Sequence, residues 1–353
     1  MLHKPKQSIL AVLLLAAALL TGCASGTTPE PEPEGPAEHA ADFFAMDTYM
    51  SFRVYGGDED TVLSCRQLVQ SLEEELSVVK EDSAVYTLNH TGSVRLSDTA
   101  ADLLARTLDL CAETDGALDV SVYPVVRAWG FTDQSPAEGS ARIPSEETIR
   151  ALLKSVDYRQ IRLEGNDVAV PEGMELDLGA VAKGYAGQIL ADELRRSGVE
   201  SAVLALGGNI QTVGSRPDGS PWRVGVQDPD GDGLLGVLSV SDLAVVTSGG
   251  YERYFTDDEG NVWWHIMDPR TGRPARSGLV SVTVLGNDGL RCDALSTALF
   301  ILGPDAAADY WRRTGGFDMI LAAEDGRLLL TPGAAAVFEP DEALTYQVEV
   351  IDG

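Results

Sequence analysis

Two short segments of the sequence combine residue types suited to chemistry on phosphates. The first segment, HIMDPRTG, runs from His265 to Gly272, and the second, DALST, runs from Asp293 to Thr297. Together they hold a histidine, an arginine, aspartates and a hydroxyl in a chain whose formal net charge is -29. Carboxylate and hydroxyl oxygens suit Mg²⁺, which keeps several waters and binds substrate phosphates. The two segments therefore predict chemistry on a phosphorylated ligand.

Asp293 and Thr297 stand four residues apart in an otherwise apolar stretch that predicts a helix from Cys292 to Leu302. At that spacing both side chains share one face of the helix. They form a metal site in one interpretation, and a helix-capping aspartate with an internal threonine in the other. His265 ends a predicted strand before a turn at Asp268-Pro269. There it could act as a base, an acid or a phosphate ligand, or it could have the structural role of hydrogen-bonding to the turn.

The segment DLGAVAKGYAG, from Asp177 to Gly187, places a carboxylate just before a predicted helix and Lys183 in its second turn. We expect this helix to begin near Ala180. Its glycines disfavour a helix, which indicates either close packing against another element or a ligand lying on the backbone. In the second case, N–H groups at the helix start could bind phosphate or a metal-bound water.

Two other segments could line a ligand site. Trp129 and Phe131 in YPVVRAWGF could line a pocket for a planar ring, or they could fill the core. The glycines beside Ser248 in TSGG favour a loop that approaches a ligand closely, rather than a serine-hydrolase elbow. The stretch GDGLLG leads into a strand instead of a helix, which argues against a dinucleotide fingerprint.

The N-terminus predicts export and lipid anchoring. Lys4 and Lys6 precede an apolar stretch that is too short to span a bilayer comfortably, and LTGC ends at Cys23. We interpret residues 1–22 as a lipoprotein signal peptide, with Cys23 lipidated and the protein extracytoplasmic on the cell membrane; the alternative is an uncleaved membrane anchor. Residues 23–42 are rich in Pro, Glu and Gly and predict a disordered tether. Residues 43–353 would form the folded domain.

The acidic composition limits the class of partner. A surface this negative argues against nucleic acid and anionic lipid headgroups. An anionic substrate could bind only where cations or helix N-termini locally reverse the field. The remaining cysteines, Cys65, Cys111 and Cys292, are odd in number and lack C-x-x-C spacing, which argues against a zinc site or a disulfide framework.

Hydrophobic periodicity predicts helices in blocks between runs of short, antiparallel-looking strands, which favours an α+β fold over a doubly wound one. We expect a strand at 46–55 and short strands between 202 and 285, with a hairpin around Gly165-Asn166. The predicted helices span 61–79, 100–114, 143–156, 180–198, 292–302 and 305–314.

Taken in order, these motifs resemble the ApbE family, the FAD:protein FMN transferases. The resemblance runs from about Met46 to Gly303 and rests on eight ordered stretches: MDTYMSFRVYG, ALDVSVYPVVRAWGF, ELDLGAVAKGYAGQIL, LALGGNI, WRVGVQDP, VVTSGGYERYF, HIMDPRTGRPA and CDALSTALFILG. It implies an α+β fold with FAD in a cleft between two lobes. It also implies Mg²⁺-dependent transfer of FMN from FAD onto a threonine or serine of an acceptor flavoprotein, with release of AMP.

The resemblance also assigns site residues by position. His265 would sit by the pyrophosphate, and either His265 or Asp177 would take the proton of the acceptor hydroxyl. The metal ligands would be Asp293, Thr297 and the carbonyl of Ala180. The FAD contacts would be Met46, Ala128, Trp129, Gly130, Asp177, Lys183 and Met267.

The sequence departs from the family pattern in two places. The usual Met-Gly-Thr is Met46-Asp47-Thr48, and Val79 stands where an aromatic would face the flavin. Both departures concern FAD affinity more than chemistry. Three alternative functions stay open: an FAD pyrophosphatase that yields FMN and AMP, a flavin-binding lipoprotein without catalysis, and a lipid-anchored scaffold.

Overall fold

The computed structural model describes residues 35–132 and 142–353, so the predicted signal peptide, Cys23 and most of the predicted tether lie outside the described residues. The folded unit is Pro36–Gly353. It begins earlier than predicted, because β1 (Glu38–Ala45) pairs residue for residue with β2 (Thr48–Tyr55). The predicted boundary at residue 43 is therefore wrong. Composition alone indicates a tether there, whereas backbone pairing to a partner strand makes it ordered.

A tight turn joins these two strands. Met46 and Asp47 both have positive φ, at 49° and 57°. Two such residues form the hairpin turn whose twist matches that of the flanking strands, and this turn favours glycine or asparagine. The predicted strand at 46–55 thus begins two residues later, at Thr48. The departure from the family's Met-Gly-Thr falls at a position where a left-handed backbone favours glycine.

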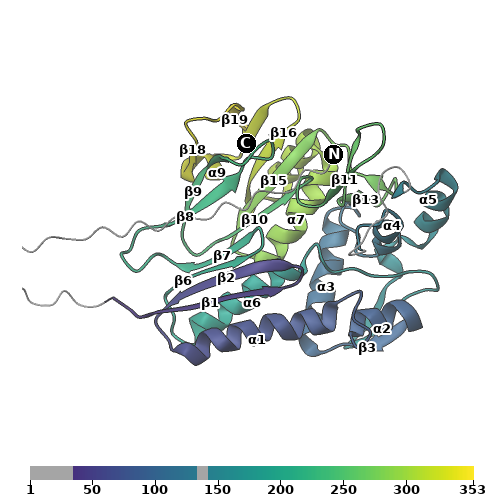
Figure 1. Ribbon diagram of the computed structural model, residues 1–353, viewed down its shortest axis with the longest axis horizontal. Helices are drawn as coiled ribbons and strands as arrows, with labels where there is room; N and C mark the ends of the chain where they lie inside the picture. Colours follow the sequence, from purple (N-terminus) through teal and green to yellow (C-terminus); the bar gives the residue numbers. More distant parts are fainter. Residues whose placement is uncertain (1–34, 133–141) are drawn as a thin grey trace, which may run out of the picture. The chain divides into compact units, whose positions relative to one another are not determined.

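The described residues form one nine-stranded sheet and several smaller ones (Figure 1). All neighbours in the large sheet are antiparallel except the last pair, β17 and β19. In sheet order, its strands are β1, β2, β6 (Ser201–Leu206), β7 (Asn209–Gly214), β10 (Ala244–Gly249), β15 (Leu279–Gly286), β16 (Asp318–Ala323), β17 (Arg327–Leu330) and β19 (Gln347–Val350). A largely antiparallel sheet with packed helices confirms the α+β prediction.

Helices and a second sheet pack against this large sheet. The helices α1 (Glu59–Leu76), α6 (Ala182–Arg196) and α7 (Gly289–Leu302) contact its strands (Figure 1). The helices α6 and α7 pack against each other, α6 mainly on β7 and α7 on β10 and β15. The second sheet packs through a separate apolar cluster that includes Trp222 and Leu238. It comprises β18 (Phe338–Pro340), β9 (Leu234–Val240) and β8 (Trp222–Gln227), with α9 (Pro332–Val337) beside it.

The other elements are short or peripheral. The helical ones are α2 (Ala84–Thr91), α3 (Asp98–Glu113), α4 (Tyr123–Ala128), α5 (Glu146–Leu152), α8 (Pro304–Thr314) and the 3-10 turns Leu153–Ser155 and Tyr158–Gln160. The strands are β3 (Ser93–Arg95), β5 (Asp167–Ala169) and β4 (Arg162–Glu164) in one sheet, β11 (Tyr254–Thr256) paired with β12 (Val262–Trp264), and β13 (Met267–Asp268) paired with β14 (Arg273–Pro274). The predicted hairpin around Gly165-Asn166 is confirmed.

The two helices that carry Lys183 and Asp293 begin at other residues than predicted. Asp288 caps α7 by accepting a hydrogen bond from the Arg291 N–H at 3.0 Å, so the helix begins three residues before the predicted Cys292. Asp293 therefore lies inside the helix, and its interpretation as the cap is wrong. Residues 175–180 form no strand beyond an isolated bridge at Glu175, and α6 begins at Ala182. Among the described residues, no helix is long and apolar enough to cross a membrane.

Candidate active site

The crossing of α6 and α7 joins two of the predicted motifs. The Gly184 N–H donates a 2.7 Å hydrogen bond to Asp293 Oδ2. A Cβ on Gly184 would lie 2.2 Å from the Gly289 carbonyl oxygen and 2.5 Å from Asp293 Cβ, and a Cβ on Gly289 would lie 2.5 Å from the Gly184 oxygen. Glycines on both helices are therefore required for this approach. Of the two interpretations of these glycines, close packing against another element holds for Gly184.

Asp293 is a buried carboxylate in a partly compensated environment. It is 4% exposed, and burial raises its pKa. The positive charge of Lys183, the Gly184 N–H and the amide of Asn209 oppose that rise by favouring the charged form. Burying an ionised group is costly unless it is paired and hydrogen-bonded. Such a carboxylate gains from any cation that reaches it.

Hydroxyl groups surround the next turn of α7. Ser248 Oγ, from β10, lies 3.3 Å from Thr297 Oγ1 and 2.7 Å from Ser296 Oγ. Ser296 in turn donates to the Asp293 carbonyl at 2.8 Å. Asp293 and Thr297 share one helical face, as their spacing predicts. The end of β10 thus reaches this turn of α7 through the Ser248 side chain.

The donor set fits a magnesium ion better than a softer metal. Asp293 and Thr297 offer oxygen only, and the predicted third ligand, the Ala180 carbonyl, would also be an oxygen. In the described part of the chain, no three His, Cys, Asp or Glu side chains gather in a way that could hold a metal ion. A cation here would take its other ligands from water and substrate phosphate, which is how Mg²⁺ commonly binds.

His265 is held as a neutral imidazole. Its backbone N–H donates to the Arg253 carbonyl at 3.0 Å, and its Nδ1 lies 3.3 Å from the same oxygen. Because a carbonyl only accepts, Nδ1 carries the proton and Nε2 keeps a lone pair. Burial, with the positive charges of Arg253 and Lys183, lowers the pKa of His265 to about 4. Near neutral pH, Nε2 is therefore unprotonated and its lone pair is available as a hydrogen-bond acceptor.

Asp177 lies among the same charges as His265. Its Oδ1 accepts the Gly179 N–H at 2.8 Å. Burial raises its pKa, the Gly179 N–H and the charges of Arg253 and Lys183 lower it, and the charge of Asp47 raises it. The charge of Lys183 thus acts on Asp177, His265 and Asp293 alike.

Two charged residues at this site were missed from the sequence. Glu252 and Arg253 follow the glycines that end β10. Burial raises the pKa of Glu252, Lys183 lowers it and Asp293 raises it. Arg253 Nη2 lies 3.8 Å from Asp47 Oδ2. The available signal was an arginine three residues after a glycine pair, in a chain poor in basic residues.

The predicted flavin contacts are placed unevenly. The Trp129 side chain is 0% exposed, donates from Nε1 to the Gly272 carbonyl at 2.9 Å and packs 5.2 Å from the Trp263 ring. Its interpretation as a ring wall is wrong, and core filling is right. Ala128 and Gly130 flank it and are half-buried. Met267 is buried in the same small core as Trp129.

The other predicted contacts lie nearer the surface. Met46 packs partly against the main core from the hairpin turn, whereas Val79 is 59% exposed beyond the end of α1. A cavity of about 630 Å³ lies elsewhere, between Leu243, Trp311 and neighbouring residues, and none of the predicted site residues lines it. The grouping of charges around Asp293 identifies the site better than cavity size does. The expected FAD cleft between two lobes stays a prediction.

Known proteins are similar to this chain in both sequence and fold. A family model described as the ApbE family matches residues 46–321. A protein named FAD:protein FMN transferase from Klebsiella pneumoniae (strain 342) is 33% identical over 313 residues, covering 86% of this chain and 94% of the relative. A protein of the same name from Treponema pallidum (strain Nichols) is 34% identical over 289 residues, covering 75% of this chain and 78% of the relative.

Solved structures agree with this likeness. The ApbE protein from Thermotoga maritima MSB8 superposes with a TM-score of 0.75 at 28% identity, covering 88% of this chain and 100% of that chain. The apo form of the Pseudomonas stutzeri flavinyl transferase ApbE gives 0.76 at 26% identity, covering 87% and 98%. With a family model over most of its length and curated relatives above 30% identity, the chain belongs to the ApbE family.

Proposed function

We propose that the protein transfers FMN from FAD to a serine or threonine hydroxyl of an acceptor protein, in a Mg²⁺-dependent reaction that releases AMP. One observation carries the proposal: a buried carboxylate, Asp293, is held by the first turn of α6 beside the charge of Lys183. Thr297 lies one turn further along the same helix. The names of the curated relatives and solved structures support flavin transfer.

The local charge explains how an acidic protein could bind an anionic dinucleotide. The positive charges of Lys183 and Arg253 lower the pKa values of both His265 and Asp177. Two basic side chains therefore lie near the place where the pyrophosphate would bind. N–H groups at the start of α6 add to the positive field. Asp293, Thr297 and the Ala180 carbonyl would hold Mg²⁺, which, when bound, neutralises phosphate charge as AMP leaves.

The transfer step needs a base and little other covalent chemistry. The acceptor hydroxyl oxygen forms a bond to the FMN phosphorus, the bond from that phosphorus to the oxygen of AMP breaks, and the hydroxyl proton moves to a base. We assign the base to His265, because its Nε2 has a free lone pair and its pKa keeps it neutral. Asp177 Oδ1 already accepts the Gly179 N–H, which leaves this carboxylate less free to take a proton. Phosphoryl transfer otherwise depends on positioning and charge stabilisation.

One experiment separates the candidate functions. The protein is incubated with FAD, Mg²⁺ and a candidate acceptor protein, and the products are analysed by mass spectrometry. A mass gain on the acceptor equal to FMN supports the proposal. Free FMN with AMP indicates a pyrophosphatase, and unchanged FAD indicates a binding protein. His265→Ala, which retains the metal ligands, should lose transfer while still binding FAD.

We also propose that the protein is lipid-anchored outside the cytoplasmic membrane through Cys23. The lipobox-like LTGC supports this, since small residues precede the cysteine after a basic and apolar leader. Expressed in a bacterium, the chain should fractionate with membranes and incorporate radiolabelled palmitate. Cys23→Ala should lose the label. Equal labelling of both forms would contradict the anchor.

A further inference from the structure

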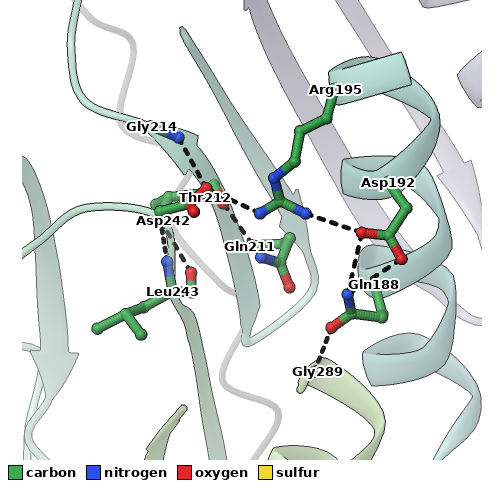
Figure 2. A network of polar contacts seen from close by, with 9 residues as sticks. All are labelled: Gln188, Asp192, Arg195, Gln211, Thr212, Gly214, Asp242, Leu243 and Gly289. Atoms are coloured by element: carbon green, nitrogen blue, oxygen red, sulfur yellow. Dashed lines mark hydrogen bonds and ion pairs between the residues drawn. The ribbon is translucent and has the colours of Figure 1, made fainter. Parts of the chain in front are cut away.

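A polar network on the far side of the α6–α7 crossing connects these helices to the sheet (Figure 2). Gln188, on α6, accepts the Gly289 N–H through Oε1 at 2.9 Å. Its Nε2 donates to the two carboxylate oxygens of Asp192 at 3.3 and 3.2 Å. The amide of Gln188 therefore has its acceptor and donor atoms fixed by two different partners.

The Gln188–Gly289 bond is paired with the bond that holds Asp293. Gly184 and Gln188 are one turn apart on α6, and Gly289 and Asp293 are one turn apart on α7. Gly184 binds Asp293 and Gln188 binds Gly289, so the helices run antiparallel with two polar anchors one turn apart. Any sliding of α7 along α6 would break both anchors together.

The two helices approach most closely at Gly184 and Gly289, and neither glycine has a side chain that could interlock with the opposite helix. The Gly289 N–H belongs to the first turn of α7, where backbone donors have no partner within the helix. Gly289 is also buried, so leaving this donor unpaired would be costly. Gln188 supplies the partner.

The network continues to the strand that carries Ser248. Arg195 donates to Asp192 at 2.8 Å and to Asp242 at 2.8 Å. Asp242 accepts the Gly214 N–H at 3.0 Å and lies in the turn that leads into β10 (Figure 2). The far end of β10 places Ser248 beside Thr297. Gln188 thus connects α7 to a network that runs along α6, through Asp192 and Arg195, to the turn before β10.

We propose that Gln188 is a positioning residue that sets the register of α7 on α6 and so places Asp293 and Thr297 for a divalent cation. The role of the cation rests on the proposed function, whereas the role in register does not. Mutation of a residue that holds a metal ligand in place typically lowers the metal affinity about 10- to 100-fold. Loss of the Gln188 amide should have an effect of that size.

The test uses the full folded protein and two measurements that need no turnover. Gln188→Met keeps the side-chain length but removes the amide. Amide hydrogen exchange at Gly184, followed by NMR or mass spectrometry, reports on the bond to Asp293. Titration with Mn²⁺ alone, followed by electron paramagnetic resonance, reports on cation binding. We expect Gly184 exchange at least about 10-fold faster and Mn²⁺ affinity about 10- to 100-fold weaker.

Two further variants separate positioning from general destabilisation. Tyr346→Phe removes a part-buried hydrogen bond of comparable type, from Tyr346 to Asp230, far from this crossing, and should change neither measurement. Gln188→Glu combined with Asp192→Asn exchanges amide and carboxylate and should restore both values to within about 3-fold of the original protein.

Each outcome decides a separate part of the inference. Unchanged Gly184 exchange in Gln188→Met would overturn the role in register. Faster exchange with unchanged Mn²⁺ affinity, or no Mn²⁺ binding by the original protein, would overturn the connection to the cation. If both measurements change as expected but the original protein transfers no FMN, the proposed function fails and the positioning role of Gln188 stands.

Discussion

Replacing Gly184 by alanine tests the site's geometry most sharply. The added Cβ would lie 2.2 Å from the Gly289 oxygen, a contact that real Cβ atoms essentially never show below 3.0 Å. The two helices must therefore separate by about 0.8 Å at this point. The Gly184–Asp293 hydrogen bond, now 2.7 Å, would lengthen to the limit of a useful bond.

The expected cost follows from three effects. Overpacking costs about 1–3 kcal/mol, and loss of a hydrogen bond to a charged group costs about 1.5–3 kcal/mol. The better helix propensity of alanine returns about 1 kcal/mol. The free energy of unfolding should thus fall by about 1.5–5 kcal/mol. Because misplacement of a catalytic group by about 1 Å can cost about 100-fold in rate, FMN transfer should fall by a similar factor.

A second glycine on the same helix provides the control. A Cβ on Gly187 would lie 3.2 Å from Gln211 Cβ and 3.5 Å from a Leu206 methyl, so small side-chain shifts can accommodate it. Urea unfolding followed by tryptophan fluorescence should place Gly187→Ala within about 1 kcal/mol of the original protein. If Gly184→Ala matched it in both stability and transfer rate, the inferred helix contact would be wrong.

Three other changes have defined outcomes. Asp47→Gly should stabilise the protein by about 1 kcal/mol in urea unfolding, since it relieves a left-handed backbone, and should tighten FAD binding most at low salt; unchanged values would contradict the turn geometry. His265 has a pKa of about 4, so kcat/KM should stay high well below pH 6.5, and Arg253→Ala should move the acid limb of the pH profile upward. Burial raises the pKa of Asp293 in the folded state above its unfolded value near 3.8. The ionised carboxylate therefore lowers the free energy of unfolding above the folded-state pKa, and it has no effect below pH 3.8, where both states are protonated. Metal-free Asp293→Asn should therefore have a higher Tm than the original protein at pH 7 and no gain below pH 3.8, while losing FMN transfer.

The sequence predicts the parts of the site that depend on local periodicity. Asp293 and Thr297 share a face because they are four residues apart in an apolar helix. The glycines around Gly184 indicate close approach, because they otherwise weaken a helix. The partner of that approach, Gly289, lies over a hundred residues away, and no local pattern identifies it.

Other features depend on packing that the sequence does not show. The strand at residues 38–45 is stabilised by pairing with β2, so its composition alone indicates a tether. An aromatic residue before a glycine has the same appearance whether it lines a ligand or fills a core, and only the burial of Trp129 decides. Arg253 reaches His265 because the hairpin of β11 and β12 brings them together.

The most direct test of the central claim is calorimetric titration of FAD into the protein with EDTA and then with Mg²⁺. If a cation at Asp293 joins this acidic protein to an anionic dinucleotide, FAD should bind at least about 10-fold more tightly with Mg²⁺. We expect this effect to be absent in Asp293→Asn and retained in Gly187→Ala. Equal FAD affinity with and without Mg²⁺, or an undiminished Mg²⁺ effect in Asp293→Asn, would contradict it.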